Sequence, residues 1–481
     1  MSDDTARPHA PDEYPSRRSS RSGESASRAP DSHCVVLGAS IGGLFAARVL
    51  SDTFGRVTLI DRDLLPETDE NRRGVPQGRH AHAILPAGTK WLQEMFPGLL
   101  EGFDADGVPV VREPTEMHFA PGGHLLSQEG RYADPTPTYQ PSRPQLEDQV
   151  RSRIRALTNV EIVDRIEATG LISTSDGQRV IGARVVHRDS GAEREIAADL
   201  VVDATGRGGR TTRWLADLGY DRPQEDRIAI DIKYVSRNLR MAPGALGRRK
   251  VVIVGACPGR PTGATLLQHG EDHWMLTLIG YGGHHPPTDP SGFLEFAKPI
   301  VPPDVFDALC AAEPLDDPVA HRYPASVRRR YERLERFPSG LLVFGDAICS
   351  FNPVYGQGMS AAALQAGALK EALAKEGGQL PRRFFKAAAR RIEVAWQMAV
   401  GSDLALPEVA GPRPLPVRIS NGFFARLLSA AEHDPALTHE FVKVSSLLAP
   451  PTILLKPGTI GRVVLGNLRR RRGNAEARQQ V

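Results

Sequence analysis

The chain lacks the features that mark several large protein classes. Its 481 residues include only four cysteines, which are widely separated and form no C-x-x-C pair. This scarcity indicates neither a disulfide framework, nor a zinc site, nor a dithiol reductase. Basic and acidic residues are nearly balanced, at 60 against 57, so we expect no nucleic-acid partner. The cysteines are Cys34, Cys257, Cys310 and Cys349.

Long apolar runs are also missing. No stretch approaches the roughly 18 consecutive apolar residues that would indicate a membrane-spanning helix. Residues 1–32 are rich in Ser, Arg, Pro and Asp, which argues against an ordinary secretory signal and predicts a disordered N-terminal arm. We therefore expect a cytoplasmic protein. The length of the chain suggests two or three domains, one of them with an extensive α/β core.

The segment that begins at Cys34 has the pattern of a strand, a tight turn and a helix. An apolar run over 34–37 ends at a glycine, and the next residues allow a pyrophosphate to approach the helix N-terminus. Ser40 replaces the middle glycine of a G-x-G-x-x-G motif, and its hydroxyl is expected to donate to a phosphate oxygen. The predicted cofactor residues of this segment are Gly38, Ser40, Ile41, Gly42 and Gly43.

A second apolar run, over 57–60, ends in an acid, Asp61. This acid follows the turn by about 20 residues, the spacing of a carboxylate that binds ribose hydroxyls. We group its neighbour Arg62 with it as a cofactor-binding residue. The glycine motif alone is equally well explained as an ordinary strand-to-helix turn, and the acid and the segments below favour a dinucleotide site.

A segment late in the chain indicates a flavin. Residues 341–344 have the pattern of a buried strand, and Asp346 follows where its carboxylate can accept hydrogen bonds from a polyol such as a ribityl chain. After Pro353, Gly356 and Gly358 comes a strong helix-forming run with free N–H groups at its start. A helix N-terminus suits the carbonyl edge of an isoalloxazine, which becomes anionic on reduction. Close helix packing alone would explain the small residues but not the whole pattern.

These segments, together with 200–206, resemble the FAD-dependent monooxygenases of the single-component aromatic-hydroxylase fold. The resemblance is closest to the actinobacterial polyene epoxidases of polyether biosynthesis, and it is strongest over 72–82, 200–206 and 340–363. Over 203–206 the sequence reads Asp-Ala-Thr-Gly in place of the family's usual Asp-Gly pair. Asp203 is still counted among the cofactor residues. The family implies FAD as cofactor and NAD(P)H as electron donor.

The resemblance also implies roles for single residues. Asp61 would bind the adenosine ribose, while Arg72 and Arg143 would bind the phosphates and the ribityl chain. The main chain of Val75 would contact the flavin ring, and Asp346 would lie at the pyrophosphate and ribityl region. The flavin carbonyls would meet the segment from Gly356 to Met359.

The arrangement of these segments predicts an α/β fold with a Rossmann-like FAD-binding domain assembled from separated pieces. It is accompanied by a β-rich substrate domain and a C-terminal helical segment with a basic tail. The expected domains are an FAD-binding domain over 33–95, 142–218 and 324–400, a substrate domain over 96–141 and 219–323, and the helical segment over 401–481.

The substrate domain is expected to cover the flavin and to enclose an apolar pocket. Alternating apolar residues over 228–235 predict a strand, and 265–268 with 274–278 predict a hairpin. Half of the alternating set should face the flavin. The apolar residues that we expect to contribute are Ile230, Leu266, Leu267, Trp274, Leu276 and Leu278.

Two patterns resemble sites but are better explained otherwise. Residues 251–259 look like a second nucleotide turn, yet Pro258 and Pro261 would interrupt the following helix, so a strand and a turn are predicted. His80, His82 and the pair at 284–285 lack cysteine or acidic partners at metal-site spacing, so no metal is expected.

The C-terminal helical segment ends in four consecutive arginines. Ile460, Val463, Val464 and Leu468 share one helical face ahead of them. A helix that docks on the protein with a solvated basic end is the favoured interpretation. Peripheral contact with an anionic membrane is the alternative.

The predicted reaction follows from the cofactor more than from side chains. A reduced flavin reacts with molecular oxygen to give a flavin hydroperoxide, which transfers one oxygen atom to a hydrophobic small molecule. Alkene epoxidation or hydroxylation in secondary metabolism is the expected outcome, and no catalytic side chain is assigned. NAD(P)H would reduce the flavin directly, or a separate flavin reductase would supply the electrons.

Three other functions share parts of this pattern. A flavin halogenase has a W-x-W-x-I-P segment, whereas the four tryptophans here are far apart. A prenyl-chain reductase of the geranylgeranyl type is the main alternative, because it shares the fold and the Gly-Asp region. A non-enzymatic flavin-binding module is disfavoured, since the segment over 353–358 builds the edge where a flavin reacts.

Overall fold

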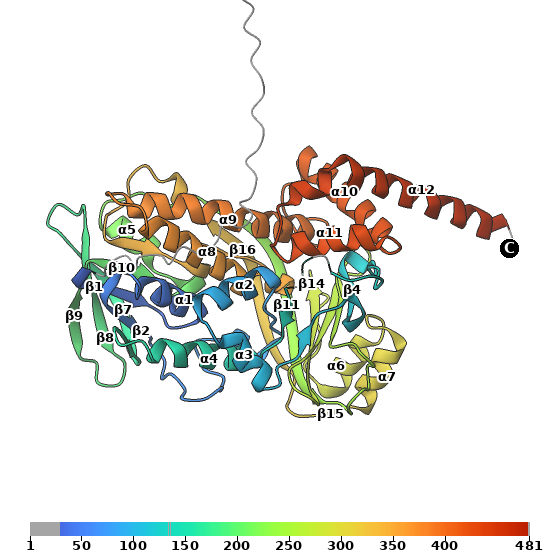
Figure 1. The fold of residues 1–481 in the computed structure, drawn as a ribbon, viewed down its shortest axis with the longest axis horizontal. Helices are drawn as coiled ribbons and strands as arrows, with labels where there is room; N and C mark the ends of the chain where they lie inside the picture. The colour runs from blue at the N-terminus through green and yellow to red at the C-terminus, as the bar shows by residue number, and fades with distance from the viewer. Residues whose placement is uncertain (1–28, 133, 135, 480–481) are drawn as a thin grey trace, which may run out of the picture.

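The computed structural model describes residues 29–132, 134 and 136–479. It contains a parallel sheet, a larger mixed sheet and a group of C-terminal helices (Figure 1). The predicted arm falls mostly on residues 1–28, which lie outside the described residues. The first strand begins at Ala29, so the last four residues expected for that arm, 29–32, lie in a strand instead.

The parallel sheet has five strands in the order β17-β10-β1-β2-β6, all paired in parallel. Their apolar runs are nearly continuous because helices or other elements cover both faces. The sheet thus joins segments that are far apart in sequence, which confirms the predicted α/β fold. The strands are β1 (Ala29–Leu37), β2 (Phe54–Ile60), β6 (Val160–Val163), β10 (Leu200–Asp203) and β17 (Leu341–Val343).

Helices pack against this sheet and against one another (Figure 1). The first of them lies directly on the turn after β1, because a Cβ at Gly43 would come within 1.7 Å of the carbonyl oxygen of Gly38. Only glycine permits this approach. The helices of this part are α1 (Ile41–Leu50), α2 (Pro86–Met95), α3 (Leu99–Ala105), α4 (Arg143–Arg155), α5 (Thr211–Asp217), α8 (Gly358–Leu373) and α9 (Leu380–Asp403).

The mixed sheet follows the order β18-β16-β11-β14-β13-β12-β4, with β15 paired to β11. Thr265 pairs with Thr277, so the predicted hairpin is confirmed. The predicted strand and turn at 251–259 are also confirmed, since a strand ends at Val254 and a turn follows. The strands are β4 (Met117–Ala120), β11 (Glu225–Arg240), β12 (Val251–Val254), β13 (Thr262–Gln268), β14 (His273–Tyr281), β15 (Glu313–Pro314), β16 (Val319–Arg329) and β18 (Cys349–Ser350).

The two faces of the mixed sheet have different partners. Trp274, Leu276 and Leu278 point to the outer face, where they pack with Leu266 against α6 (Pro290–Ala297) and α7 (Pro303–Ala311). The inner face is directed toward the part of the molecule that contains the parallel sheet. Of the six apolar residues expected to line a pocket there, only Leu267 does so. The expectation was wrong for the other five. On β13 and β14 the outward residues alternate with threonines that face inward, whereas Ile230 of β11 packs in a separate apolar cluster with Tyr281 and Leu404.

Two small antiparallel sheets complete the β structure. One has the order β7-β8-β9 and consists of β7 (Ile166–Ser173), β8 (Val180–His187) and β9 (Glu193–Ala197). The other pairs β3 (Val110–Val111) with β5 (Thr138–Tyr139).

The C-terminal part is helical, and its last helix extends away from the body of the molecule (Figure 1). It contains α10 (Leu415–Ala431), α11 (Pro435–Ser445) and α12 (Pro457–Gln479), which share a small apolar core around Leu427 and Phe441. Helix α9 crosses the expected boundary at residue 400 and ends at Asp403. Across the described residues, no helix has the length and apolar character needed to cross a bilayer.

Candidate functional site

A cleft of about 640 Å³ lies between the parallel sheet and the inner face of the mixed sheet. Its volume is within the range of about 300–1,000 Å³ typical of small-molecule sites. One wall is formed by the turn after β1, the start of α1, the end of β2 and the segment 345–362. The other wall comes from β11, β12, β13, β14 and β16. The two sheets therefore contribute opposite sides of one cavity.

Two helix N-termini open into the cleft on the first wall. Helix α1 begins at Ile41 and α8 begins at Gly358, and in neither does the side chain of the N-cap residue accept a hydrogen bond from the helix N–H groups. The first N–H groups of a helix have no partner within the helix, and they carry partial positive charge. Both ends are therefore suited to electron-rich groups of a ligand.

Asp61 connects the end of β2 to the turn after β1. Its Oδ2 accepts a hydrogen bond of 2.7 Å from the main-chain N–H of Ala39, and its Oδ1 accepts one of 2.9 Å from Asp63. The guanidinium of Arg72 donates to both acids, at 3.2 Å and 3.0 Å. Asp61 lines the cleft, so its carboxylate holds the turn in place at the position predicted for the ribose.

Arg143 and Ser40 meet at a buried acid that sequence analysis missed. Glu147 lies one turn after Arg143 on α4, and it accepts hydrogen bonds from Arg143, at 2.8 Å, and from Ser40, at 2.7 Å. Arg72 forms an ion pair with its other oxygen at 3.4 Å. Burial would raise the pKa of Glu147, but Arg143 and Arg72 outweigh it and lower the pKa to about 2. The hydroxyl of Ser40, expected to donate to a phosphate, donates here to Glu147.

Asp346 follows β17 and has its side chain in the cleft. The residue is exposed to the cavity, but the protein atoms around the cleft partly desolvate its carboxylate and raise its pKa to about 6, while Arg143 and Arg207 act in the opposite direction. The preceding Gly345 has a positive φ of 67°, and its N–H donates to the side chain of Gln365 at 2.9 Å. The carboxylate is thus positioned by a fixed turn at the edge of the cavity.

The segment before α8 is held by a buried polar cluster. Tyr355 lines the cleft and donates a hydrogen bond of 2.8 Å to Asp403 at the end of α9. Asn352 donates to the same carboxylate oxygen at 2.7 Å, and to the hydroxyl of Tyr281 at 2.8 Å. Burial raises the pKa of Asp403 to about 7, and these hydrogen bonds oppose the rise. The cluster joins the segment before α8 to strand β14 of the mixed sheet.

The second wall of the cleft combines aromatic, aliphatic and polar side chains. The ring of His80 lies 4.6 Å from that of Tyr234, and its Nδ1 is 2.7 Å from the hydroxyl of Ser236. The guanidinium of Arg207 lies 4.6 Å from the centre of the Tyr323 ring. The residues that the mixed sheet contributes are Tyr234, Ile253, Thr265, Leu267, Thr277, Ile279, His321 and Tyr323.

His82 has a defined protonation pattern. Its Nδ1 lies 2.8 Å from the main-chain carbonyl of His80, and because a carbonyl only accepts, Nδ1 carries the hydrogen. Burial and the charge of Arg143 lower the pKa of His82 to about 3, so the ring is neutral at physiological pH. The other ring nitrogen, Nε2, is therefore a hydrogen-bond acceptor on a residue that lines the cleft.

The structure brings most of the predicted cofactor residues together on the cleft wall. Three are not there. Gly43 packs against the turn, Val75 is buried nearby, and Asp203 accepts hydrogen bonds from Thr205 and Thr211 away from the cavity. Asp203 therefore supports the chain after β10 in this structure. The residues that do line the cleft are Gly38, Ser40, Ile41, Gly42, Asp61, Arg62, Arg72, Arg143, Asp346, Pro353, Gly356, Gly358 and Met359.

The cleft fits an FAD molecule in the features that the cofactor requires. A Cβ added at Gly356 or Gly358 would meet no atom within 4 Å, so the main chain borders open space where a flat ring can lie. One uncapped helix end suits the pyrophosphate, and the other suits the flavin carbonyls. The residues placed to hold the cofactor are those of the first wall.

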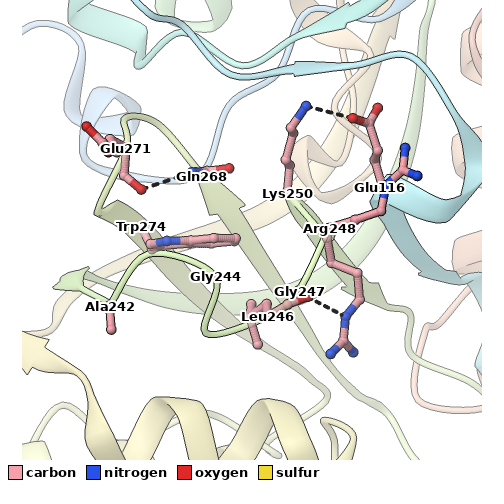
Figure 2. Close-up of a pocket in the computed structure, with 11 residues that line it drawn as sticks. Glu116, Ala242, Gly244, Leu246, Gly247, Arg248, Lys250, Gln268, Glu271 and Trp274 are labelled. Carbon is pink, nitrogen blue, oxygen red and sulfur yellow. Dashed lines mark hydrogen bonds and ion pairs between the residues drawn. The ribbon is translucent and has the colours of Figure 1, made fainter.

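A second, smaller pocket lies at the far end of the mixed sheet (Figure 2). Its volume is about 280 Å³, and it contains three basic residues. Lys250 pairs with Glu116 at 2.7 Å, as Figure 2 shows, and Arg248 and Arg249 pair with Glu113 and Asp304. Because these charges are already neutralised, the pocket has little to attract an anionic ligand. Nor do the described residues contain a group of three or more His, Cys, Asp or Glu arranged to hold a metal ion.

Comparisons with known proteins agree with a flavin site. Residues 68–230 match the FAD binding domain family. The chain is 40% identical over 450 residues to protein Rv3254 of Mycobacterium tuberculosis, which covers 92% of this chain and 94% of that protein.

Solved structures share the fold at low identity. The flavin-dependent brominase Bmp2 is 15% identical and has a TM-score of 0.63, over 92% of this chain and 100% of that one. p-Nitrophenol 4-monooxygenase PnpA from Pseudomonas putida is 17% identical with a TM-score of 0.62, over 86% and 98%. These likenesses show the fold of the chain.

Proposed function

We propose that this chain, which belongs to the family of protein Rv3254 and has the fold of flavin monooxygenases and halogenases, is an FAD-dependent monooxygenase. It would insert one atom of molecular oxygen into an unsaturated, largely apolar small molecule of secondary metabolism in the cytoplasm. The observation that carries this proposal is the shape of the cleft, in which uncapped helix ends face a separate aromatic and aliphatic wall. A protein that only stored a flavin would not need that second wall.

The protein's own residues would hold the reactants and keep water away from them. Bound FAD, once reduced, would supply the activation of molecular oxygen. The N–H groups at the start of α1 would bind the pyrophosphate, and those at the start of α8 would bind the flavin carbonyls. On the other side, Tyr234, Ile279 and Tyr323 would cover the substrate and exclude water from the reacting atoms.

The electrostatics of the cleft favour a substrate whose reacting group needs no deprotonation before it receives the oxygen atom. Burial lowers the pKa of His80 and of His82 to about 3, so both are poor proton acceptors at neutral pH, and Asp346, whose pKa is raised to about 6, follows β17 on the cofactor side of the cleft. Hydroxylation of a phenol is helped by a nearby base, whereas epoxidation of an alkene needs none. We therefore favour an alkene as the reacting group of the substrate.

The same wall argues for one polar end on that substrate. Nε2 of His82 is a hydrogen-bond acceptor, and none of the described residues donates a hydrogen bond to it. A hydroxyl or amide group of the substrate would supply the missing hydrogen, while the apolar body would be held by burial at about 25 cal/mol per Å². Hydroxylated polyenes and terpenoids have this combination.

The source of electrons is a separate part of the proposal. We propose that NADPH or NADH reduces the flavin directly, and that a separate flavin reductase is the alternative. Anaerobic mixing of the FAD-loaded protein with each nucleotide, followed at the flavin absorbance band, distinguishes the two. Bleaching indicates direct reduction, and its absence with both nucleotides indicates a partner enzyme.

The reaction itself is tested with labelled molecular oxygen. The FAD-loaded protein, a reductant and a metabolite extract of the host are incubated together, and products are identified by mass spectrometry. We expect an apolar metabolite to gain one labelled oxygen atom. A product that gains two hydrogens without oxygen would identify a prenyl-chain reductase, and a product that forms only with added bromide would identify a halogenase.

A further inference from the structure

The C-terminal helices expose apolar side chains that the cleft does not use. Among the described residues, eleven large hydrophobic side chains are exposed, and seven of these lie between residues 415 and 468. Isolated exposed apolar residues are ordinary, but a concentration in one short region indicates an interaction surface. The seven are Leu415, Ile419, Leu455, Ile460, Val464, Leu465 and Leu468.

Helix α12 has its apolar residues on two opposite faces. Val463 is buried, and Gly466 packs against Ala430 of α10 so closely that a Cβ would come within 2.8 Å of it. This is the docked face. The predicted grouping of Val463 with Ile460, Val464 and Leu468 on one face was therefore wrong in part, because Val463 belongs to the docked side.

The outer face of α12 carries an apolar stripe at intervals of four residues. The side chains of Ile460, Val464 and Leu468 are 41%, 53% and 50% exposed. Residues four apart lie on the same side of a helix, so these three are neighbours on one surface. In Figure 1 this helix extends beyond the body of the protein, which leaves the stripe free to meet a flat partner.

The sequence of α12 and the residues before it is basic. No acidic residue occurs between Glu440 and Glu476, whereas that interval contains seven basic residues. Three acids from outside the interval reach α12, since Asp434 pairs with Arg462, Glu432 pairs with Arg470 and Glu440 accepts a hydrogen bond from Thr459, so the basic excess comes from the other basic residues. The seven are Lys443, Lys456, Arg462, Arg469, Arg470, Arg471 and Arg472.

From the stripe and the charge together we infer that the outer face of α12 docks on an anionic phospholipid bilayer. Apolar side chains would enter the boundary of the acyl chains while arginines and lysines meet the headgroups. A second copy of the chain fits less well. A symmetric dimer through this surface would bring the two basic sets together, and like charges repel.

The inferred surface is connected to the cleft. The side chain of Gln357, immediately before α8, donates a hydrogen bond of 3.2 Å to the main-chain carbonyl of Ser445 at the end of α11. The main-chain N–H of Ala87 in α2 donates to the carbonyl of Ser446 at 3.3 Å. Docking would therefore hold the catalytic half of the protein beside the lipid in which an apolar substrate dissolves.

Vesicle flotation with the full-length, FAD-loaded protein tests the inference without any substrate. The vesicles contain phosphatidylcholine alone, or phosphatidylcholine with about one third phosphatidylglycerol. We expect binding to the anionic vesicles and at least tenfold weaker binding to the neutral ones. Binding to the anionic vesicles should weaken in about 1 M salt, where the Debye length falls to about 3 Å.

The double variant Val464→Ser and Leu468→Ser removes two side chains of the stripe that make no contact with the protein core. It should bind anionic vesicles at least tenfold more weakly than the wild type. The matched control is Leu315→Ser, which alters an exposed leucine on the mixed-sheet half and should bind as the wild type does. FAD content should be the same in all three proteins.

Three results would overturn the inference. The first is a wild-type protein that floats with neither type of vesicle, and the second is a double variant that binds as strongly as the wild type. The third is a wild-type dimer, seen by light scattering without lipid, that the double variant converts to a monomer. That third result would assign the surface to self-association.

Discussion

The carboxylate of Asp403 accepts a hydrogen bond of 2.8 Å from the hydroxyl of Tyr355, and it thereby holds the segment that borders the cleft. Among the described residues, every hydrogen bond to Asp403 goes to Oδ1, and Oδ2 is buried with no partner. Burial raises the pKa of this acid to about 7. The native state therefore holds the proton more tightly than the unfolded chain does.

The variant Asp403→Asn should have a weaker pH dependence of stability. Because the native pKa is raised, the contribution of Asp403 to stability is fully present below the ordinary carboxyl pKa and is lost as the pH rises toward about 7. The slope from this one group is at most about 1.4 kcal/mol per pH unit. Urea unfolding at a series of pH values measures it, and Asp217→Asn, at an exposed acid, should leave the slope unchanged. Identical slopes in Asp403→Asn and the wild type would contradict the prediction.

The variant Glu147→Gln should be strongly destabilised at neutral pH. The change leaves the buried guanidiniums of Arg72 and Arg143 without their shared carboxylate, and breaking such a buried pair costs about 3–5 kcal/mol. The native pKa is lowered to about 2, so the wild type should lose this stabilisation as the pH falls from the ordinary carboxyl range toward that value. Urea unfolding at neutral and acidic pH gives both quantities. A variant as stable as the wild type at neutral pH would show that the cluster is dispensable.

FAD retention should depend on Asp346 more than on Asp203. Asp346 lines the cleft, and loss of a charge-assisted hydrogen bond to the cofactor costs about 1.5–3 kcal/mol, or about ten- to a hundredfold in affinity. Asp203 instead bonds Thr205 and Thr211, so Asp203→Ala should lower the unfolding temperature. The ratio of flavin to protein absorbance after gel filtration, with thermal unfolding alongside, separates the two effects. Equal FAD content in Asp346→Ala and Asp203→Ala would refute the assignment.

The two faces of the mixed sheet should respond differently to substitution. Leu276 is buried against α6 and α7, so Leu276→Ala should lower the free energy of unfolding by about 2–5 kcal/mol. Thr265, which pairs with Thr277 on the other face, lines the cleft, so Thr265→Val should change stability by less than about 0.5 kcal/mol and alter substrate selection instead. Denaturant unfolding and product profiles test the pair. A large loss of stability in Thr265→Val would show that the inner face also contributes to the packed core, which would contradict the prediction.

Local patterns in the sequence were sufficient to predict the cofactor side of the cleft. The turn at Gly38, the acid Asp61 and the start of α8 each depend on residues close together in the chain, and all three line one cavity. The substrate side was predicted less well. Alternation locates a strand but does not say which of its two faces is inward, and here the leucines near Leu276 face outward.

The buried acids Glu147 and Asp403 were missed for a related reason. Asp403 gains its role from Asn352, Tyr355 and Tyr281, which reach it from distant parts of the chain. Glu147 did have a local signal, since it follows Arg143 by four residues on a helix. An acid and a base at this spacing usually form a solvent-exposed pair, and only the structure shows that this pair is buried.

The uncapped helix ends at Ile41 and Gly358 have a consequence for biosynthesis. They come from opposite ends of the sequence, so a ribosome has released the first long before the second has been translated. A nascent chain, or a fragment truncated before α8, has only half of the cavity wall and cannot enclose a flavin. Cofactor loading is therefore a late event in the life of the polypeptide, and yellow colour in a preparation reports chains that were translated through α8.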